Sequence, residues 1–565
     1  MSLFRRLYAV SALLSCLALV SARLRDGRLH GNIMRPASVP LVSAPSADVP
    51  VVSRNGTVLP PYTTIFLFDQ LIDHNNPSLG TFKQRFWHTW EFYEAGGPII
   101  LSTPGETNAD AGFSGYLTNR TINGQIAQQQ NGSTIVLEHR FYGLSNPAAD
   151  LSVKSLKLHT IQQAIDDLEY FAKNVNLPMP GGDSVGPDKA PWILVGGSYA
   201  GALTSWTMVN KPGLFAAGYA SSAVVEAILD FWQYFEPIRQ NMPKNCSADV
   251  EAVISRVDKT LSGRNATAIQ AIKDNFGLGV MTHLDDVAGS LRNNLWDWQG
   301  LQVTSGAGNQ FTKFCDALEV KDGVSAPASG WGVDHALAAW GSYWRSTYLA
   351  LICDDQDAET CLGSYNTTQS FWTDTSLDNA NRSWMWIVCN EVGYLQDGAP
   401  ITSPSLVTRL VQPSYDLRQC QQMFSAAFPV PPIPNTLATN IKYRGWNVQI
   451  KNLFFANGVR DPWRDATLSA DGRNAHSTAS QPIAEGDGFH CSDLLTSSNI
   501  DPTILAVQNQ GLASMKTWIA AWKPHSSGFP VKTPRSVPTP PQQLPSLPFV
   551  KPINAWFKKF GSASH

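Results

Sequence analysis

Charged side chains are scarce in this chain. Asp, Glu, Lys and Arg make up only 15% of its 565 residues, and the formal net charge is −3. A protein that binds nucleic acid needs a basic surface against the phosphates, and this composition offers none. No acidic run that would gather cations is present either. We therefore expect no nucleic-acid partner.

Long apolar runs are missing after the first twenty residues. No later stretch reaches the roughly 18 uninterrupted apolar residues of a membrane span, so no membrane anchor is expected. At the N-terminus, two arginines precede an apolar run from Leu7 to Val20, and small residues end it at Ala22. This pattern is typical of a secretion signal over residues 1–22, so we expect an exported protein.

Cysteine patterns that hold metals are absent as well. The chain has no C-x-x-C pair and no His/Cys spacing typical of zinc, so we expect no metal and no cofactor. Removal of the signal leaves seven cysteines. Proximity in sequence predicts the disulfides Cys246–Cys315, Cys353–Cys361 and Cys389–Cys420, with Cys491 free. A free cysteine is usually a small buried side chain, so Cys491 is not expected to be a nucleophile.

The chain carries seven Asn-X-Ser/Thr sequons, which beside a secretion signal predict glycans on surface segments. They are Asn55, Asn119, Asn131, Asn245, Asn265, Asn366 and Asn381.

Periodicity divides the rest of the chain. Residues 63–225 and 441–523 alternate short apolar runs with helical patterns, which predicts an α/β fold with a doubly wound, mostly parallel sheet. Between them, residues 226–440 form a long insert with helices expected over 248–261 and 266–276. An insert of this size would cap the sheet.

The two ends of the chain differ from this pattern. Residues 23–60, rich in Pro, Val and Ser, are expected to be a linker or a removable propeptide. Residues 524–565 contain nine prolines and little apolar periodicity, so we expect a disordered tail.

The most telling motif begins at Gly196. The apolar residues 191–195 run into Gly196-Gly197-Ser198-Tyr199-Ala200-Gly201, and a helical pattern follows. A strand, a tight turn and a helix would expose the Ser198 hydroxyl at the end of the strand, as in serine hydrolases. The glycine of the usual G-x-S-x-G is displaced by one position. Taken alone, an ordinary strand-to-helix turn remains an alternative.

Two later strand patterns supply the partners of a catalytic serine. The apolar residues 453–456 precede Asp461, and residues 482–484 lead to His490. The order Ser198, Asp461, His490 is that of an α/β-hydrolase, and each residue follows a strand. The three side chains are therefore expected at one edge of the sheet. Asp465 is a rival acid, but it lies further from its strand.

Other polar groups fit catalysis less well. His74, His88 and His139 precede the nucleophile, where this fold places no catalytic base, and His476 follows no strand. Glu138, His139 and Arg140 form a charged trio, for which we expect a structural network of ion pairs and hydrogen bonds.

An oxyanion hole needs two backbone N–H groups. Tyr199, which follows the nucleophile, is expected to supply one. The other is expected from the loop after the strand at residues 99–102, where Gly105 is favoured because Pro104 has no N–H.

Several blocks together resemble the S28 family of serine peptidases, which includes prolyl carboxypeptidase, dipeptidyl peptidase II and fungal acid prolyl endoproteases. The resemblance extends from about residue 63 to about residue 522 and is strongest toward the fungal endoproteases. It implies an α/β-hydrolase fold with a helical specificity cap, the nucleophile Ser198, the acid Asp461 and the base His490. The blocks are residues 68–77, 97–106, 138–143, 196–201, 457–463 and 488–494.

The resemblance also implies cleavage after proline by an exported, acid-active endoprotease on proline-rich peptides or proteins. An acidic compartment such as a vacuole is a second possible location. Proline is flat and apolar, so an aromatic pocket suits it; Trp463, Trp386 and Tyr199 are candidate walls. Acid activity requires that His490 stays neutral at low pH.

Other functions stay open at this stage. In a prolyl exopeptidase, Glu106 would bind the free amine of the substrate. A lipase or esterase, or an inactive binding protein, could use the same scaffold. The sequence sets no oligomeric state.

Overall fold

The computed structural model describes residues 30–36, 38–45, 49–110, 112–354, 356–473 and 475–524. The chain divides into two units, Met1–Pro524 and His525–His565, and every described residue belongs to the first. The predicted signal peptide and all but one residue of the predicted tail lie outside the described residues. Within the described ranges, no helix is both long and apolar enough to span a bilayer.

An eight-stranded sheet forms the core of the first unit, in the order β1-β2-β4-β3-β5-β6-β11-β12. Strands β1, β2 and β4 pair antiparallel in turn, and all pairs from β4 to β12 are parallel. The strands are β1 Phe66–Leu71, β2 Thr81–Thr89, β3 Ile99–Ser102, β4 Ser133–Leu137, β5 Trp192–Gly197, β6 Ala217–Ser221, β11 Leu453–Gly458 and β12 Ile483–Gly486.

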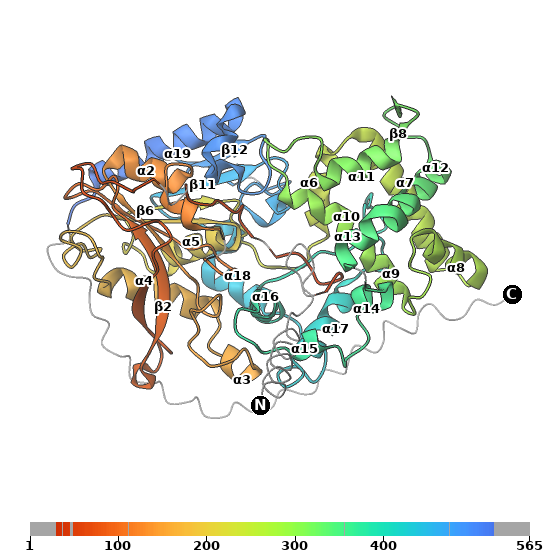
Figure 1. The fold of residues 1–565 in the computed structure, drawn as a ribbon, viewed down its shortest axis with the longest axis horizontal. Helices are drawn as coiled ribbons and strands as arrows, with labels where there is room; N and C mark the ends of the chain where they lie inside the picture. The colour runs from red at the N-terminus through yellow and green to blue at the C-terminus, as the bar shows by residue number, and fades with distance from the viewer. Residues whose placement is uncertain are drawn as a thin grey trace, which may run out of the picture. The chain divides into compact units, whose positions relative to one another are not determined.

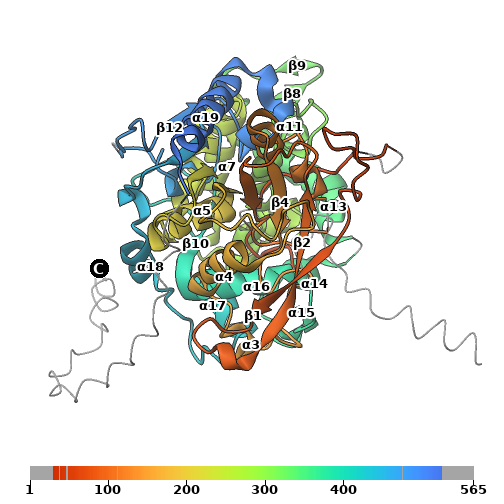
Figure 2. The same ribbon diagram turned by 90° about the vertical axis from the view of Figure 1, so that its left-hand side faces the viewer.

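Helices cover both faces of this sheet, as the buried parallel strands require. Helices α2 (Ile122–Gln130) and α19 (Pro502–Ala521) lie together on one face, and α4 (Ile161–Asn174) and α5 (Ser198–Asn210) lie on the other (Figure 1). Helix α4 begins where the Thr160 hydroxyl accepts a hydrogen bond from the backbone N–H of Gln163. Figure 2 shows the same layers from the side of the sheet. The predicted α/β-hydrolase architecture is confirmed.

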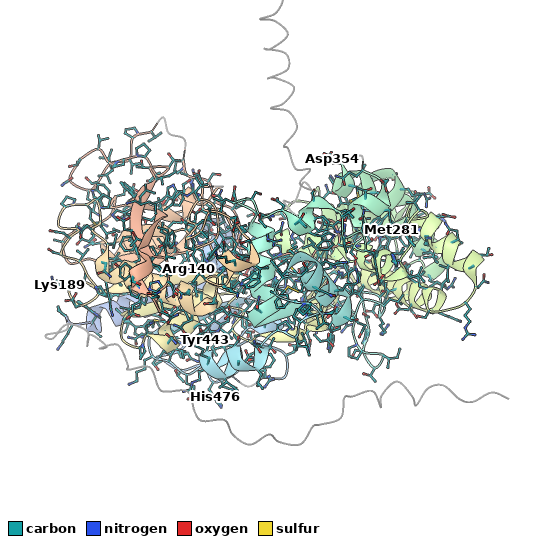
Figure 3. The ribbon with its side chains drawn as sticks, turned by 90° about the horizontal axis from the view of Figure 1, so that it is seen from below. Arg140, Lys189, Met281, Asp354, Tyr443 and His476 are labelled. Carbon is teal, nitrogen blue, oxygen red and sulfur yellow. A yellow bond between two sulfur atoms is a disulfide. The ribbon has the colours of Figure 1, made fainter. Side chains whose placement is uncertain are left out.

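The long insert is mainly helical and lies between β6 and β11, beside the sheet (Figure 1). In Figure 3 the labels Arg140 and Met281 mark these two parts of the molecule. The larger helices of the insert are α6 Glu236–Asn241, α7 Lys244–Leu261, α8 Ala266–Asn275, α9 Leu284–Ser290, α11 Gln310–Glu319, α12 Val333–Tyr343, α16 Ala380–Ile387, α17 Pro413–Met423 and α18 Thr436–Tyr443. The shorter helices are α10 Asn293–Trp296, α13 Leu349–Cys353, α14 Ala358–Leu362 and α15 Ser370–Thr373.

Small strands add to the insert. Strands β7 (Ile228–Asp230) and β10 (Gly393–Leu395) pair in parallel and tie the beginning of the insert to its later part. Strands β8 (Val320–Lys321) and β9 (Val324–Ser325) form a short antiparallel pair. Outside the insert, a single turn of helix, α3 (Val153–Leu156), precedes α4.

Three disulfides lie within the insert: Cys246–Cys315, Cys353–Cys361 and Cys389–Cys420. Cys491 is free and buried. The pairing predicted from sequence proximity is therefore the one observed.

The segment expected to be a linker or propeptide is packed into the protein over residues 30–36 and 38–45. Ile33 and Met34 are buried in the insert, and Val39 is buried in the core of the sheet domain. An unstructured linker would leave such side chains in water. The composition of this stretch gave no sign of its burial, because its contacts are with residues far away in the sequence.

Candidate active site

The nucleophile turn stands between β5 and α5. Ser198 is the first residue of α5 and has a φ angle of 58°, a conformation that costs energy for a residue with a side chain. A Cβ atom added at Gly201 would lie 2.7 Å from the carbonyl oxygen of Ser221, so the close approach of helix and strand depends on this glycine. Ala200 has no positive φ angle. The close contact with Ser221 explains why the glycine of the motif stands at position 201, one residue later than in G-x-S-x-G.

Ser198, His490 and Asp461 meet at the carboxyl edge of the sheet, after β5, β12 and β11. The Nε2 atom of His490 is 2.8 Å from the Ser198 Oγ, and its Nδ1 atom is 2.8 Å from the Asp461 Oδ1. All three side chains are almost completely buried. The backbone N–H of Trp463 also donates to the Asp461 Oδ1, which fixes the carboxylate. This is the geometry of a hydroxyl activated by an oriented base.

The electrostatics of His490 depend on Asp461. Burial disfavours the charged imidazolium, but the charge of Asp461 and its hydrogen bond outweigh burial, so the pKa of His490 lies well above its usual value. Cys491 next to it is a buried thiol whose pKa is raised by burial. Its side chain therefore stays neutral and unreactive near neutral pH.

Gly105, one of the expected oxyanion donors, lies beside the first turn of α5, and its N–H donates to the Thr103 Oγ1 at 3.4 Å in this structure. Gly105 has a φ angle of 79°, and a Cβ atom built on it would lie 3.4 Å from the Cβ of Ala200 and 3.6 Å from the ring of Tyr199. The loop after β3 is thus packed against the first turn of α5. Its glycine allows the backbones to approach as an oxyanion hole needs.

A cavity of about 680 Å³ opens beside His490. Glu106 lines it, is 97% buried, and has an Oε1 atom without a hydrogen-bond partner among the described residues. Burial raises the pKa of Glu106 to about 8. An unpaired buried acid at the wall of a cavity is poised to interact with whatever enters it.

Aromatic side chains stand behind the triad. The ring of Trp463 lies 6.3 Å from that of His490 and packs against Phe231, Tyr234 and Tyr394. The Trp463 Nε1 donates to the Oε1 of Gln299, a cavity residue that carries no distinguishing signal in the sequence.

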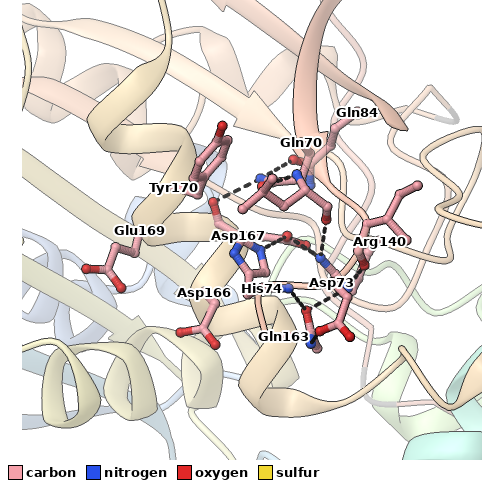
Figure 4. A network of polar contacts seen from close by, with 12 residues as sticks. Gln70, Asp73, His74, Gln84, Arg140, Gln163, Asp166, Asp167, Glu169 and Tyr170 are labelled. Carbon is pink, nitrogen blue, oxygen red and sulfur yellow. Dashed lines mark hydrogen bonds and ion pairs between the residues drawn. The ribbon is translucent and has the colours of Figure 1, made fainter. Parts of the chain in front are cut away.

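The rival groups have structural partners. His74 and Arg140 both bind Asp167, at 2.7 Å (Nε2 to Oδ1) and 2.6 Å (Nε to Oδ2), in the network of Figure 4. Arg85 donates from Nε to the Glu138 Oε2 at 2.8 Å. The charged trio is therefore the structural network that we expected, not a second site.

His476 and Asp465, the alternative base and acid, take no part in the hydrogen bonds of the triad. His476 lies exposed at the surface (Figure 3). The Asp465 carboxylate accepts a hydrogen bond from the backbone N–H of Asp471.

Comparison with known proteins decides the family. The family model described as serine carboxypeptidase S28 matches residues 70–512, which contain every residue of the triad. The chain belongs to this family. It is a serine peptidase of family S28, as the resemblance of its sequence blocks predicted.

Relatives of this S28 peptidase span most of its length. It is 32% identical to the serine protease vicPb of Bipolaris victoriae, over 84% of this chain and 92% of that protein. It is 31% identical to a probable extracellular serine carboxypeptidase of Arthroderma benhamiae, over 70% of this chain and 57% of that protein. The human thymus-specific serine protease is 25% identical, over 80% of this chain and 86% of that protein.

Among solved structures, an acetylester hydrolase from Corynebacterium glutamicum aligns with 80% of this chain and 95% of its own. The TM-score is 0.34 and the sequence identity is 11%.

Two expectations for the S28 peptidase need correction. Trp386 does not stand at the triad: its Nε1 donates to the His159 carbonyl, and its ring packs against Phe424 and Phe428. Asn381 is not a surface sequon, because it is 92% buried and lines the cavity beside His490. A glycan on Asn381 would have to occupy the cleft.

The other sequons are more accessible. Asn131 and Asn245 are half-buried, and the remaining four are exposed: Asn55, Asn119, Asn265 and Asn366. Tyr199 contributes its backbone next to Gly105, while its ring is fully buried and its hydroxyl lies 3.2 Å from the His139 Nε2.

Proposed function

We propose that this S28 peptidase is exported and hydrolyses peptide bonds on the carboxyl side of proline, within chains, through an acyl-enzyme. The observation that carries the proposal is the hydrogen-bonded line from Ser198 through His490 to Asp461. The extracellular relative, the disulfides and the signal-like N-terminus support export.

The chemistry follows from these positions. The Ser198 Oγ attacks the carbonyl carbon while its proton moves to the His490 Nε2. The carbonyl oxygen becomes an oxyanion, which the N–H groups of Tyr199 and Gly105 would stabilise. His490 then gives the proton to the leaving amine, and an ester on Ser198 remains. Water, deprotonated by His490, hydrolyses this ester and restores the free hydroxyl.

Proline specificity is supported by the apolar surroundings of the triad. Trp463 packs edge-on against Tyr234 and Tyr394 behind His490; all three rings are almost completely buried, so they back the site and do not line the cavity. A flat, rigid pyrrolidine ring would lose little conformational entropy on binding beside such rigid apolar surroundings.

The pKa of His490 bears on the acid activity that the family resemblance implies. His490 can act as a base only while it is neutral, and Asp461 raises its pKa. The free enzyme would therefore lose its base as the pH falls.

The decisive test combines a fluorophosphonate probe with matched substrates. We expect Ser198 to be labelled, a blocked prolyl amide to be cleaved, and an otherwise identical alanyl amide to be cleaved at least about tenfold more slowly. Ser198→Ala should lose the label and about 10⁶-fold in kcat. Turnover of a p-nitrophenyl ester without any prolyl amide would instead indicate an esterase or lipase. Absence of labelling in folded protein would indicate an inactive binding protein.

A prolyl exopeptidase is the second candidate, and Glu106 is the observation that favours it. When ionised, its carboxylate would pair with the free amine of a substrate, and an ammonium group in the cavity would itself lower the pKa of Glu106. Arg35 lines the same cavity and would suit a terminal carboxylate instead.

Three proline peptides distinguish these modes: one blocked at both ends, one with a free amine and one with a free carboxylate. An endoprotease should cleave the doubly blocked peptide as well as the others. An amine-dependent exopeptidase should prefer the free amine at least tenfold, and Glu106→Gln should remove that preference. The Gln variant keeps the shape of the acid, so its activity on the blocked peptide serves as the control.

A further inference from the structure

One segment joins the insert and the sheet domain across the mouth of the cavity. We call residues 30–36 and 38–45 the strap. Its first part is held by the insert: the Asn32 side-chain amide donates to the carbonyls of Leu362 and Asp286 at 2.6 and 3.0 Å, and the backbone N–H of Gly31 donates to Cys361. Ile33 is 99% buried there.

The second part of the strap is held by the sheet domain. The Tyr116 hydroxyl donates to the Pro40 carbonyl at 2.8 Å. Val42 exchanges two backbone hydrogen bonds of 2.8 Å with the loop before α2, donating to Gly112 and accepting from Gly115. These contacts resemble those of a strand edge and fix the path of the chain.

Between the two anchors, the strap passes the catalytic residues. Val39 packs against the residue that precedes the nucleophile: a Cβ atom added at Gly197 would lie 2.6 Å from the Val39 Cγ1. Strap residues 35–36 and 38–41 line the cavity that also contains His490 and Glu106. The Gln299 amide donates to the Pro36 carbonyl at 2.9 Å, while its oxygen accepts from Trp463. Gln299 thus links the strap to Trp463, which lies behind the triad.

We propose that the strap is a permanent wall of the substrate cleft, retained in the active enzyme, and not part of a removable propeptide. Its removal would expose the apolar side chains that Ile33, Met34 and Val39 cover. It would also take a hydrogen-bond acceptor from the buried guanidinium of Arg292, which contacts the Asn32 carbonyl. Any cleavage that releases an N-terminal peptide must then occur before His30.

This inference rests on the proposed function only in that the cavity is the cleft of a peptidase. The first experiment labels the secreted enzyme with the fluorophosphonate probe and determines the N-terminus of the labelled protein. We expect labelled chains to begin at or before His30. A labelled population that begins after residue 45 and lacks the strap would overturn the proposal. Complete failure of labelling would count against the proposed function and not against the strap, which the second experiment tests through retention of the strap fragment and the melting temperature.

The second experiment cuts the chain behind the strap. A recognition sequence for an added protease is inserted between Asn55 and Gly56, in an exposed turn. After cutting, the strap fragment should stay bound through gel filtration, with the melting temperature nearly unchanged and kcat/KM within twofold of the uncut enzyme. Loss of the fragment would overturn the proposal, and a rise in activity on its loss would identify the fragment as an inhibitory propeptide.

A pair of variants isolates the contact with the nucleophile turn. Val39→Ala should lower the melting temperature and reduce kcat/KM several-fold, because the side chain supports Gly197. Leu41→Ala lies in the same strap but is 67% exposed, and should leave the melting temperature unchanged. Equal, negligible effects of the two changes would contradict a structural role for the strap at the site.

Discussion

At the scale of single residues, His490 sets the pH range of the enzyme. Its pKa is raised by Asp461, so the neutral form needed for catalysis is lost as the pH falls through that raised value. We expect kcat/KM on a prolyl amide to rise about tenfold per pH unit below this pKa and to level off above it. The measurement is a profile from pH 4 to 9, with circular dichroism to confirm that the fold persists.

Asp461→Asn provides the control for this profile. The variant should lose about 10⁴-fold in kcat, because the imidazole is held in the wrong tautomer. Its residual activity should titrate at a lower pH, since the carboxylate charge is gone. A maximum below pH 6 in the unmodified enzyme, as the family resemblance implies, would show that another group lowers the pKa of His490 during catalysis.

Residue by residue, the sequence was informative where function depends on chain order. Ser198, Asp461 and His490 could be predicted because each follows a strand and the order is specific to one fold. Trp386 could not be placed, because aromatic residues in a Trp-rich insert look alike until their packing is known. The surface position predicted for Asn381 was wrong for a related reason. A sequon depends on three neighbouring residues in the sequence, whereas the burial of Asn381 depends on the strap and the insert, which surround the same cavity.

At the scale of elements, the junction of β5 and α5 depends on a missing side chain. Gly201→Ala would place a Cβ atom 2.7 Å from the backbone oxygen of Ser221, and backbone atoms cannot move aside cheaply. We expect a loss of stability of about 2 kcal/mol or more and at least a tenfold loss in kcat/KM, because the turn that carries Ser198 would shift.

Thermal unfolding and kinetics on the purified variant test this expectation. Gly308→Ala is the matched control, since Gly308 has open space around it and no positive φ angle. That change should be neutral or slightly stabilising. If Gly201→Ala behaved like Gly308→Ala, the close contact of helix and strand would not be important.

The elements themselves were predictable where periodicity is strong. The helices expected over 248–261 and 266–276 correspond to α7 and α8, and the strand expected at 453–456 corresponds to β11. The strap was not predictable, because an extended segment without regular secondary structure has no periodicity. Its fixed path comes from side-chain and backbone hydrogen bonds to distant loops.

At the scale of the whole molecule, buried acids favour folding at lower pH. Burial raises the pKa of Glu106 to about 8 and of Glu391 to about 7, so these groups take up protons in the folded chain at a pH where the unfolded chain is still ionised. Stability should therefore increase as the pH falls from 8 to 6.5, with Glu106 alone contributing on the order of 2 kcal/mol.

Buried histidines oppose this trend at lower pH. Burial lowers the pKa of His88 and His139 to about 4. Below about pH 6.5 these histidines are therefore protonated in the unfolded chain but not in the folded chain, which lowers the free energy of unfolding. From pH 8 to 6.5 the raised pKa of His490 acts in the same direction as the buried acids, so scanning calorimetry must compare the unmodified enzyme with a Glu106 variant to isolate Glu106. Glu106→Gln should flatten the curve there, and an unchanged slope in that variant would contradict the assignment.

Across the molecule, every observed disulfide lies between residues 246 and 420, while the sheet that carries Ser198, Asp461 and His490 contains none. We therefore expect reduction of the disulfides to impair the binding of substrate before it impairs bond cleavage. We expect production in a reducing cytosol to destabilise the insert more than the sheet, because the insert holds all three disulfides. Such a preparation would still react with a small phosphonate while failing on long peptides.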